Sequence, residues 1–405
     1  MAYRTMSTSD IEEVSVIRCV ESARYHSDGY DCFGFHKPIS RLFEPKHRDG
    51  WCTEKRSNWQ EGGDAEWDRD NSVFILFACC MPVIGARRSS LCDLQRGLVQ
   101  LVPSGLAEML KTHRGKAVAE IKAAYEHRYD ARIEEYFRFL IANEFGFWCD
   151  DDVDAFPEIN IEWDEPERIT NAIIDIDISS EHNLFSILKD LDDLGCKALQ
   201  VRFYSGGRIG QLRELLSAAH GTCLRAIDLV VPFHVDDTQQ EYQQLCLDFP
   251  RISHIFVHSS PFNRAARFEQ MRVPLVYRTS VVDSPACCGE VHASYFVAHI
   301  KTFTEAQSHN TCLNRKISID ARGDIRNCPS LPHSFGNIRD TSLHSALAQR
   351  DFTELWSINK NQIEICRDCE FRYVCIDCRA YLTQPAHRFS KPAKCGYDPY
   401  TAQWR

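Results

Sequence analysis

The stretch CRDCEFRYVCIDC, residues 366–378, holds four cysteines separated by two, five and two residues. Three further cysteines extend the series, Cys312 and Cys328 before it and Cys395 after it. Gly323 lies between the first two, where a tight turn lets a hairpin return Cys328 towards Cys312. Seven thiols at these spacings predict a metal-binding domain in the last quarter of the chain.

Iron–sulfur clusters and zinc both bind cysteine thiolates. A four-iron cubane needs four thiolates that converge from different directions, and a two-residue gap lets two neighbouring thiolates bind one metal centre. Zinc could instead take one tetrahedral site of the zinc-ribbon type, with the ligands Cys366, Cys369, Cys375 and Cys378. The five-residue middle gap is short for a ribbon, and the other three cysteines would have no ligand role. The sequence favours iron–sulfur clusters, with a zinc-stabilised adaptor as the alternative.

Composition and charge narrow the functional classes. The chain of 405 residues carries 57 Asp and Glu against 47 Lys and Arg, a net charge of −10, which argues against a protein that binds duplex nucleic acid. Its longest uncharged run, residues 71–86, is shorter than the roughly 20 residues that cross a bilayer, and no secretory signal is visible. We therefore expect a cytoplasmic protein without nucleic-acid or membrane partners, whose nineteen cysteines are metal ligands and buried thiols instead of disulfides.

Periodicity divides the chain into four segments of an α/β protein. Residues 1–70 lack a repeating apolar pattern and predict a loosely ordered extension. Residues 71–150 predict strands followed by three short helices, which is typical of a winged-helix module. In residues 151–285 strands alternate with helices, a pattern that predicts parallel βα units in a partial barrel or an open sheet. Residues 286–405 contain the spaced cysteines.

The cysteine series resembles the SPASM domain found at the carboxy end of radical enzymes that modify peptides. The resemblance implies two auxiliary [4Fe–4S] clusters with interleaved ligands. By position, one cluster is held by Cys366, Cys369, Cys375 and Cys395. The other is held by Cys312, Cys328 and Cys378, with Cys288 as fourth ligand and Cys287 as the second choice. The chain departs from the family pattern at Cys375 and Cys378, which are separated by two residues where the family commonly has three.

The middle segment lacks the residues that radical chemistry on S-adenosylmethionine requires. In radical enzymes of this kind, three cysteines spaced CxxxCxxC follow the first barrel strand. Here that strand, residues 172–178, runs into Ser179-Ser-Glu-His-Asn183, and no CxxxCxxC occurs in the chain. Arg208 follows two glycines where the radical family has a Glu that accepts a hydrogen bond from the cofactor's ammonium group, and an Arg repels that group. The resemblance therefore implies a degenerate radical-type barrel that uses no S-adenosylmethionine.

Motifs in the last hundred residues resemble the SPASM-domain peptide maturases of grasp-with-spasm systems. The motifs are Ile317-Ser-Ile-Asp320, Arg326-Asn-Cys-Pro329, Asp377-Cys-Arg-Ala380 and Lys394-Cys-Gly-Tyr-Asp-Pro-Tyr400. The resemblance implies a partner ATP-grasp ligase and a ribosomally made precursor peptide, whose leader the winged-helix module captures as an added strand. A further alternative is an enzyme that binds its substrate at an iron left open by the cluster ligands.

Overall fold

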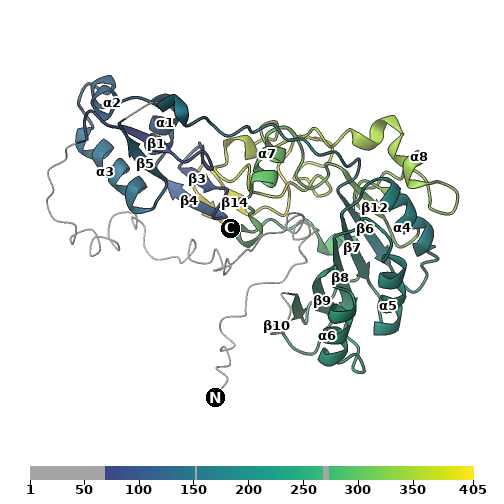
Figure 1. The fold of residues 1–405 in the computed structure, drawn as a ribbon. Coiled ribbons are helices and arrows are strands. Elements are labelled where there is room, and N and C mark those ends of the chain that lie inside the picture. Colours follow the sequence, from purple (N-terminus) through teal and green to yellow (C-terminus); the bar gives the residue numbers. More distant parts are fainter. Residues whose placement is uncertain (1–68, 151–152, 268–272) are drawn as a thin grey trace, which may run out of the picture.

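The computed structural model describes residues 69–150, 153–267 and 273–405, in a mixed α/β fold with a mostly parallel sheet (Figure 1). The extension predicted for residues 1–70 lies, except for its last two residues, outside the described part of the chain. Among the described helices, none combines the length and the apolar character that a membrane crossing requires.

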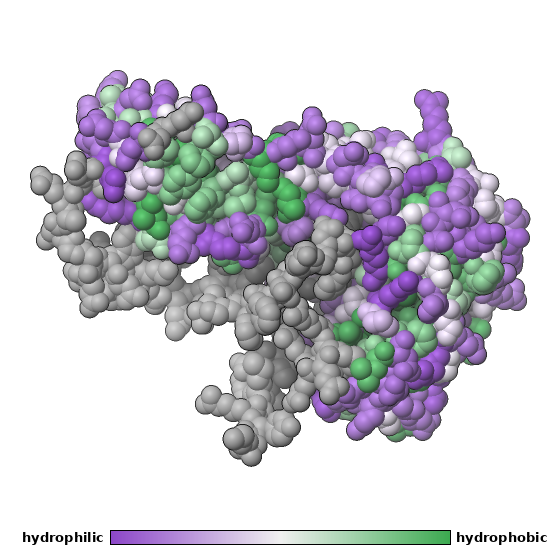
Figure 2. All heavy atoms as spheres, in the orientation of Figure 1, coloured by the Kyte–Doolittle hydropathy of each residue, from purple (hydrophilic) through white to green (hydrophobic). Residues whose placement is uncertain are grey.

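The amino-terminal module pairs short strands with three helices. Its strands β2, β3 and β4 form an antiparallel meander, and β1 pairs with β5. The elements are β1 (Val73–Leu76), β2 (Cys80–Val83), β3 (Ser89–Asp93), β4 (Leu98–Val102), α1 (Ser104–Thr112), α2 (Val118–Ala124), α3 (Asp130–Ala142) and β5 (Gly146–Cys149). Leu91, Leu106 and Phe137 form part of the core between strands and helices. Figure 2 shows apolar residues, in green, gathered over this module on the face drawn.

The central sheet has the strand order β10-β11-β9-β8-β7-β6-β12-β13, and its strands are parallel except for β10 and β13 at the two edges. The elements are β6 (Asn171–Ile176), α4 (Leu184–Asp193), β7 (Ala198–Phe203), α5 (Ile209–Ala218), β8 (Ala226–Pro232), α6 (Gln239–Asp248), β9 (Ile252–His258), β10 (Arg264–Arg267) and β11 (Pro274–Tyr277). Leu188, Leu212 and Leu245 of the three helices are buried in one core with the strands. The predicted alternation of strands and helices is thus confirmed.

The cysteine-rich segment contributes a hairpin to this sheet. β12 (Lys316–Ile319) lies beside β6 and returns as the antiparallel strand β13 (Ile325–Arg326). Gly323 makes the predicted turn with φ of +87°, and its N–H donates to the carbonyl oxygen of Asp320 at 2.8 Å. Cys312 precedes the hairpin and Cys328 follows it, so the sheet itself positions both thiols.

Buried polar side chains lie on the sheet face opposite the helices. Along β7, Leu199, Val201 and Phe203 belong to the helix-covered core, so the alternating residue Arg202 points to the other face. Its guanidinium donates two hydrogen bonds to Asp175, at 2.6 and 2.8 Å, and the Tyr204 hydroxyl donates a third at 2.6 Å. The buried ion pair is tolerated because both oxygens of the carboxylate have partners.

The rest of the cysteine-rich region folds mostly in turns. Its regular elements are short: α7 (Ile300–Ser308), α8 (Leu343–Leu347), β14 (Tyr397–Asp398), β15 (Gln403–Trp404) and several 3-10 turns. The rings of Phe296, Phe371, Tyr397 and Trp404 pack on one another with centroid distances of 4.8 to 6.2 Å. With so few long elements to stabilise it, this region depends on side-chain packing, and metal ligation would add to its stability.

Candidate metal centre

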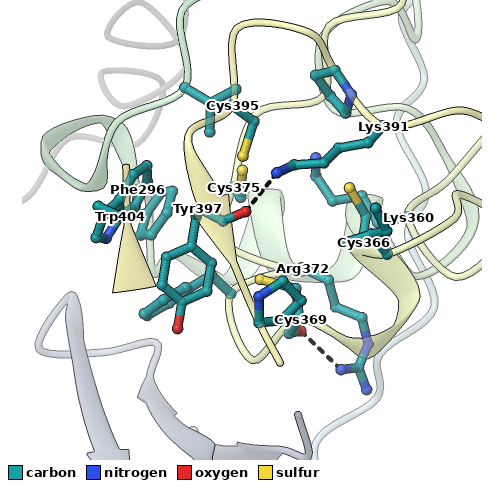
Figure 3. A pocket seen from close by; sticks show the side chains of 15 residues that line it. Phe296, Lys360, Cys366, Cys369, Arg372, Cys375, Lys391, Cys395, Tyr397 and Trp404 are labelled. Atoms are coloured by element: carbon teal, nitrogen blue, oxygen red, sulfur yellow. Dashed lines mark hydrogen bonds between the residues drawn. The ribbon is translucent and has the colours of Figure 1, made fainter. Parts of the chain in front are cut away.

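Four of the seven spaced cysteines line one cavity (Figure 3). Cys366 begins a 3-10 turn (Cys366–Asp368) and Cys369 directly follows it. Cys375 comes from the following turn, and Cys395 from the segment that leads into β14. A cavity lined by four thiols suits a metal centre, because thiolates are the ligands of both iron–sulfur clusters and structural zinc.

Burial favours the protonated form of three of these thiols when no metal is bound. It raises the pKa of Cys366, raises the pKa of Cys369 well above the usual thiol value, and raises the pKa of Cys375 to about 12. A metal binds thiolates, so it must displace these protons. Buried thiols with raised pKa values are poor nucleophiles, so the chemistry of this group points to ligation and not to covalent catalysis.

A buried lysine stands beside this first group. Lys360 is 4% exposed and lines the same cavity. Burial opposes its charge, but interaction with the thiolate forms of Cys375 and Cys366 and with the Asp377 carboxylate outweighs burial and raises the pKa of Lys360. Its ammonium lies 3.7 Å from the Asp377 carboxylate and donates to the carbonyl oxygen of Ile376 at 3.1 Å. A permanent positive charge next to the cavity stabilises thiolates or an anionic cluster within it.

The second group lies next to the central sheet. Cys312, Cys328 and Cys378 are 7%, 7% and 6% exposed. Cys312 and Cys328 belong to one buried cluster around Leu313, and Cys328 is close enough to Cys378 to raise its pKa, with burial as the larger cause. The structure thus brings these three predicted ligands into one neighbourhood, which does not include the cavity of the first group.

The second group also has a buried lysine. Lys316, the first residue of β12, is 3% exposed and its ammonium lies 3.4 Å from the Cys312 sulfur. In the described part of the chain, no carboxylate lies within ion-pair distance of Lys316. A buried ammonium without a carboxylate is costly unless another anion balances it. The thiolate of Cys312 or a cluster bound to it would supply that anion.

The segment at Cys288 packs against Cys378. Gly289 has φ of +89°, and a Cβ placed on it would come within 2.9 Å of the Cys378 sulfur. Cys288 is 7% exposed. Cys287 is more exposed and its thiol donates to the carbonyl oxygen of Val281 at 3.6 Å. Cys288 as the eighth ligand, with Cys287 as the second choice, remains a prediction from the sequence.

The grouping of the cysteines differs from the grouping that a zinc ribbon would require. A zinc ribbon would combine Cys378 with Cys366, Cys369 and Cys375. In the structure the fourth cysteine of the cavity is Cys395, while Cys378 lies with Cys328. The unusual spacing between Cys375 and Cys378 thus separates two neighbouring ligands into different groups.

Sequence reasoning missed how the amino-terminal module meets the first group. Glu370, directly after Cys369, is fully buried and accepts hydrogen bonds from Arg88 at 2.7 Å and from the Tyr397 hydroxyl at 2.5 Å. The Ser90 hydroxyl donates to the carbonyl oxygen of Glu370 at 2.7 Å. These contacts fix the β2–β3 loop on the metal-binding turn, and the sequence held no local signal for them.

The loop after β7 carries the predicted change at Arg208. This residue pairs with Asp236 at 3.0 Å and with Asp237 at 3.3 Å. These carboxylates hold the guanidinium at the position where the radical family has its Glu. The absence of S-adenosylmethionine chemistry remains a prediction from the sequence.

Residues 311–370 match the family model of SPASM, an iron–sulfur cluster-binding domain. The chain therefore contains a SPASM domain. No curated protein matches the sequence. The solved structures that resemble it include Streptococcus suis SuiB bound to S-adenosylmethionine, with 9% identity, 80% of this chain and 97% of that chain covered, and a TM-score of 0.28. A second structure of Streptococcus suis SuiB has 9% identity, covers 77% of this chain and 95% of that chain, and gives a TM-score of 0.24.

The SPASM match confirms the predicted class of cofactor, an iron–sulfur cluster. It includes Cys312, Cys328, Cys366 and Cys369, and ends before the remaining spaced cysteines. The number of clusters, their ligands and the grasp-with-spasm subfamily remain predictions.

Proposed function

We propose that the protein is an iron–sulfur maturation factor for a ribosomally made precursor peptide, acting with a separate ATP-grasp ligase and without S-adenosylmethionine chemistry. The observation that carries the proposal is the cavity in which Cys366, Cys369, Cys375 and Cys395 meet, beside the buried Lys360 and within and just after the SPASM match. Support for the peptide and the ligase comes from the sequence motifs that resemble grasp-with-spasm maturases.

Two [4Fe–4S] clusters fit the two cysteine groups. The first would be held by Cys366, Cys369, Cys375 and Cys395, and the second by Cys312, Cys328, Cys378 and Cys288. When bound, such clusters supply electron transfer and, at an iron without a protein ligand, a Lewis-acid site. The chain itself positions the thiolates, and Lys316 and Lys360 balance part of their charge.

The winged-helix-like module would bind the leader of the precursor. In the described residues β2 and β4 are the edges of the three-stranded sheet. Pro82 lies in β2 and has no N–H to donate to an added strand, whereas β4 (Leu98-Val-Gln-Leu-Val102) contains no proline. Leu98 is 47% exposed and Phe77 is 40% exposed. A bound extended peptide could bury these two apolar side chains. Edge pairing at β4 would combine main-chain affinity with side-chain selectivity.

ATP chemistry would belong to a second protein. The chain has no phosphate-binding loop motif, so the energy for bond formation would come from the ligase. The SPASM protein would present the precursor to that ligase and act on it through its clusters.

A binding and turnover experiment tests this function. Cluster-loaded protein, ligase, precursor and ATP are combined, and mass spectrometry follows the loss of water that accompanies each bond formed by condensation. We expect product only when the loaded protein and the full precursor are both present. Leu98→Asp should weaken precursor binding at least about tenfold, because a buried charge opposes edge pairing with an apolar leader. Leu247→Asp on α6, which changes a 49% exposed leucine, is the control and should bind normally. Equal product without the loaded protein would contradict the proposal.

The second candidate is an enzyme with an open iron site. It is favoured by the second group, in which the structure brings together three of the spaced cysteines, Cys312, Cys328 and Cys378. If Cys288 does not ligate, one iron of that cluster can bind a substrate thiol or carboxylate. Precursor-induced change in the electron paramagnetic resonance spectrum of this cluster alone would favour the second candidate.

A further inference from the structure

Three ligand-type side chains converge in the amino-terminal module, away from both cysteine groups. Cys79 lies in the turn before β2, Cys80 is the first residue of β2, and Asp93 is the last residue of β3, opposite Cys80 in the strand register. The two sulfur atoms and a carboxylate oxygen all lie within 4.8 Å of one another. Cys80 and Asp93 are each 2% exposed, and Cys79 is half-buried.

We infer that Cys79, Cys80 and Asp93 bind one thiophilic divalent cation of the zinc class. Two thiolates and one carboxylate are a ligand set that zinc accepts, and thiolates select against hard cations such as magnesium. The site is independent of the iron–sulfur clusters and of the proposed function.

The charges around this site balance. Two thiolates and a carboxylate exceed a divalent cation by one negative charge. Arg96 supplies the missing positive charge, because its guanidinium is paired with Asp93 Oδ2, while its other carboxylate partner, Glu144 at 3.8 Å, is exposed to solvent. A buried metal site with no net charge avoids the large cost of an uncompensated charge in a low-dielectric environment.

Asp93 keeps room for a metal. Its Oδ1 accepts the backbone N–H groups of Gln95 at 3.0 Å and Arg96 at 2.8 Å, and Oδ2 accepts from the Arg96 side chain. A carboxylate offers about four lone-pair positions, so these three bonds leave one unused. Gln95 brings a further oxygen, since its Oε1 lies 3.7 Å from the Cys79 sulfur. This amide or a water can complete four-coordination.

A purely structural role explains part of this arrangement. Asp93 caps the turn between β3 and β4 through its backbone contacts, and Cys80 contributes to the core of the module. Neither role requires the second sulfur, that of Cys79, to lie within 4.8 Å of both the Cys80 sulfur and the Asp93 carboxylate. A bound cation would hold these three groups together. Cys79 packs against the core of the module and against the core shared with the SPASM domain, so the cation would stabilise their junction.

Metal analysis of the full chain tests the site. Protein is first loaded anaerobically with iron and sulfide so that the SPASM cysteines are occupied, then exposed to zinc and washed with a weak chelator. We expect one zinc per chain with iron unchanged. Cys79→Ala/Cys80→Ala should lose the zinc and keep the iron, whereas Cys196→Ala/Cys246→Ala, which removes two other buried thiols, should keep both. Arg96→Gln should weaken zinc binding roughly 10- to 100-fold, as expected for a neighbour that orients and balances a ligand.

Cadmium provides a readout of the ligands themselves. The ¹¹³Cd resonance of iron-loaded protein should lie in the range of mixed sulfur and oxygen coordination and should disappear in Cys79→Ser/Cys80→Ser. Unchanged iron content and circular dichroism in both double variants show that they are folded. Zinc-free wild-type protein after the wash, or zinc retained by the Cys79/Cys80 double variants, would overturn the inference.

Discussion

The two cysteine groups of the SPASM region differ in where their surroundings come from. The first group lies within about 30 residues of chain, Cys366 to Cys395, and its four thiols share one cavity. The second group draws Cys312 and Cys328 from the two ends of the β12–β13 hairpin and Cys378 from the tight cysteine run. The second group also lies close to the central sheet, since Cys328 is one of the groups, after Asp175 and Tyr204, that raise the pKa of Arg202 on β7 against the effect of burial.

The thiols of the first group are positioned by a short stretch of chain, whereas two thiols of the second group are positioned by the central sheet. The first group brings four thiols to one cavity. The second lies beside the polar sheet face of Arg202 and Asp175, and the sequence predicts Cys288 as its fourth thiol. We therefore expect the first cluster to be structural or electron-transferring, and the second to be the one that faces a substrate.

The largest expected effect is on iron content. Cys369→Ala should lose roughly half of the iron and destabilise the SPASM domain, because a cubane missing a thiolate is weakly held and cluster binding is coupled to folding. Cys378→Ala should lose the other half and leave the first cluster in place. Iron analysis measures how much iron each variant retains, and electron paramagnetic resonance shows which cluster remains.

Cys196→Ala serves as the control for this experiment. Cys196 is a fully buried thiol in the core between the helices and the central sheet, which contains none of the spaced cysteines. The iron content of this variant should therefore equal that of the wild type. Loss of all iron from both Cys369→Ala and Cys378→Ala would contradict two separate groups.

The next effect is on redox potential. Lys316→Met should lower the midpoint potential of the second cluster, and Lys360→Met that of the first, because each removes a buried positive charge that favours the reduced, more negative state. A shift of about 60 mV corresponds to a tenfold change for a one-electron couple, and we expect at least that. Redox titration followed by electron paramagnetic resonance measures it. If either variant shifted the midpoint potentials of both clusters equally, the two groups would not be separate sites, and the comparison would be wrong.

A smaller effect concerns the contact between the amino-terminal module and the first group. A Cβ on Gly85 would meet Arg88 O at 2.5 Å and Glu370 Cβ at 2.9 Å. Gly85→Ala should therefore lower the free energy of unfolding by about 1–3 kcal/mol, as overpacking does. Chemical denaturation measures this loss. Gly221→Ala is the control, since a Cβ there meets nothing within 4 Å. Equal stability of the two variants would show that the β2–β3 loop does not anchor the first group.

The smallest expected effect is none at all. With S-adenosylmethionine and a strong reductant, the cluster-loaded protein should form no 5′-deoxyadenosine, because the chain lacks CxxxCxxC and carries Arg208 where the radical family has a Glu. Liquid chromatography of the reaction measures it. Reductant-dependent 5′-deoxyadenosine would mean that one of the two groups has an iron that binds this cofactor.

Local spacing made part of the structure predictable. The turn at Gly323 and the hairpin that joins Cys312 to Cys328 followed from a glycine between two cysteines, and the structure confirms them. The alternation of strands and helices in the middle segment was readable for the same reason, since each element carries its own apolar pattern.

Contacts between distant residues could not be read from the sequence. Arg88 and Glu370 are separated by 282 positions, and nothing local to either one indicates the other. Lys316 and Lys360 look like ordinary charged residues in the sequence, and only the fold reveals that both are buried beside thiols. The pairing of β12 with β6, which ties the second group to the sheet, is equally non-local.

The central claim is that the two cysteine groups hold two separate four-iron clusters. Its most direct test is iron and sulfide analysis, with Mössbauer spectroscopy, of wild-type protein reconstituted anaerobically under reducing conditions. We expect about eight irons and eight sulfides per chain, all in cubane clusters. Protein that binds stoichiometric zinc and takes up no iron, or that saturates at about four irons, would contradict the claim.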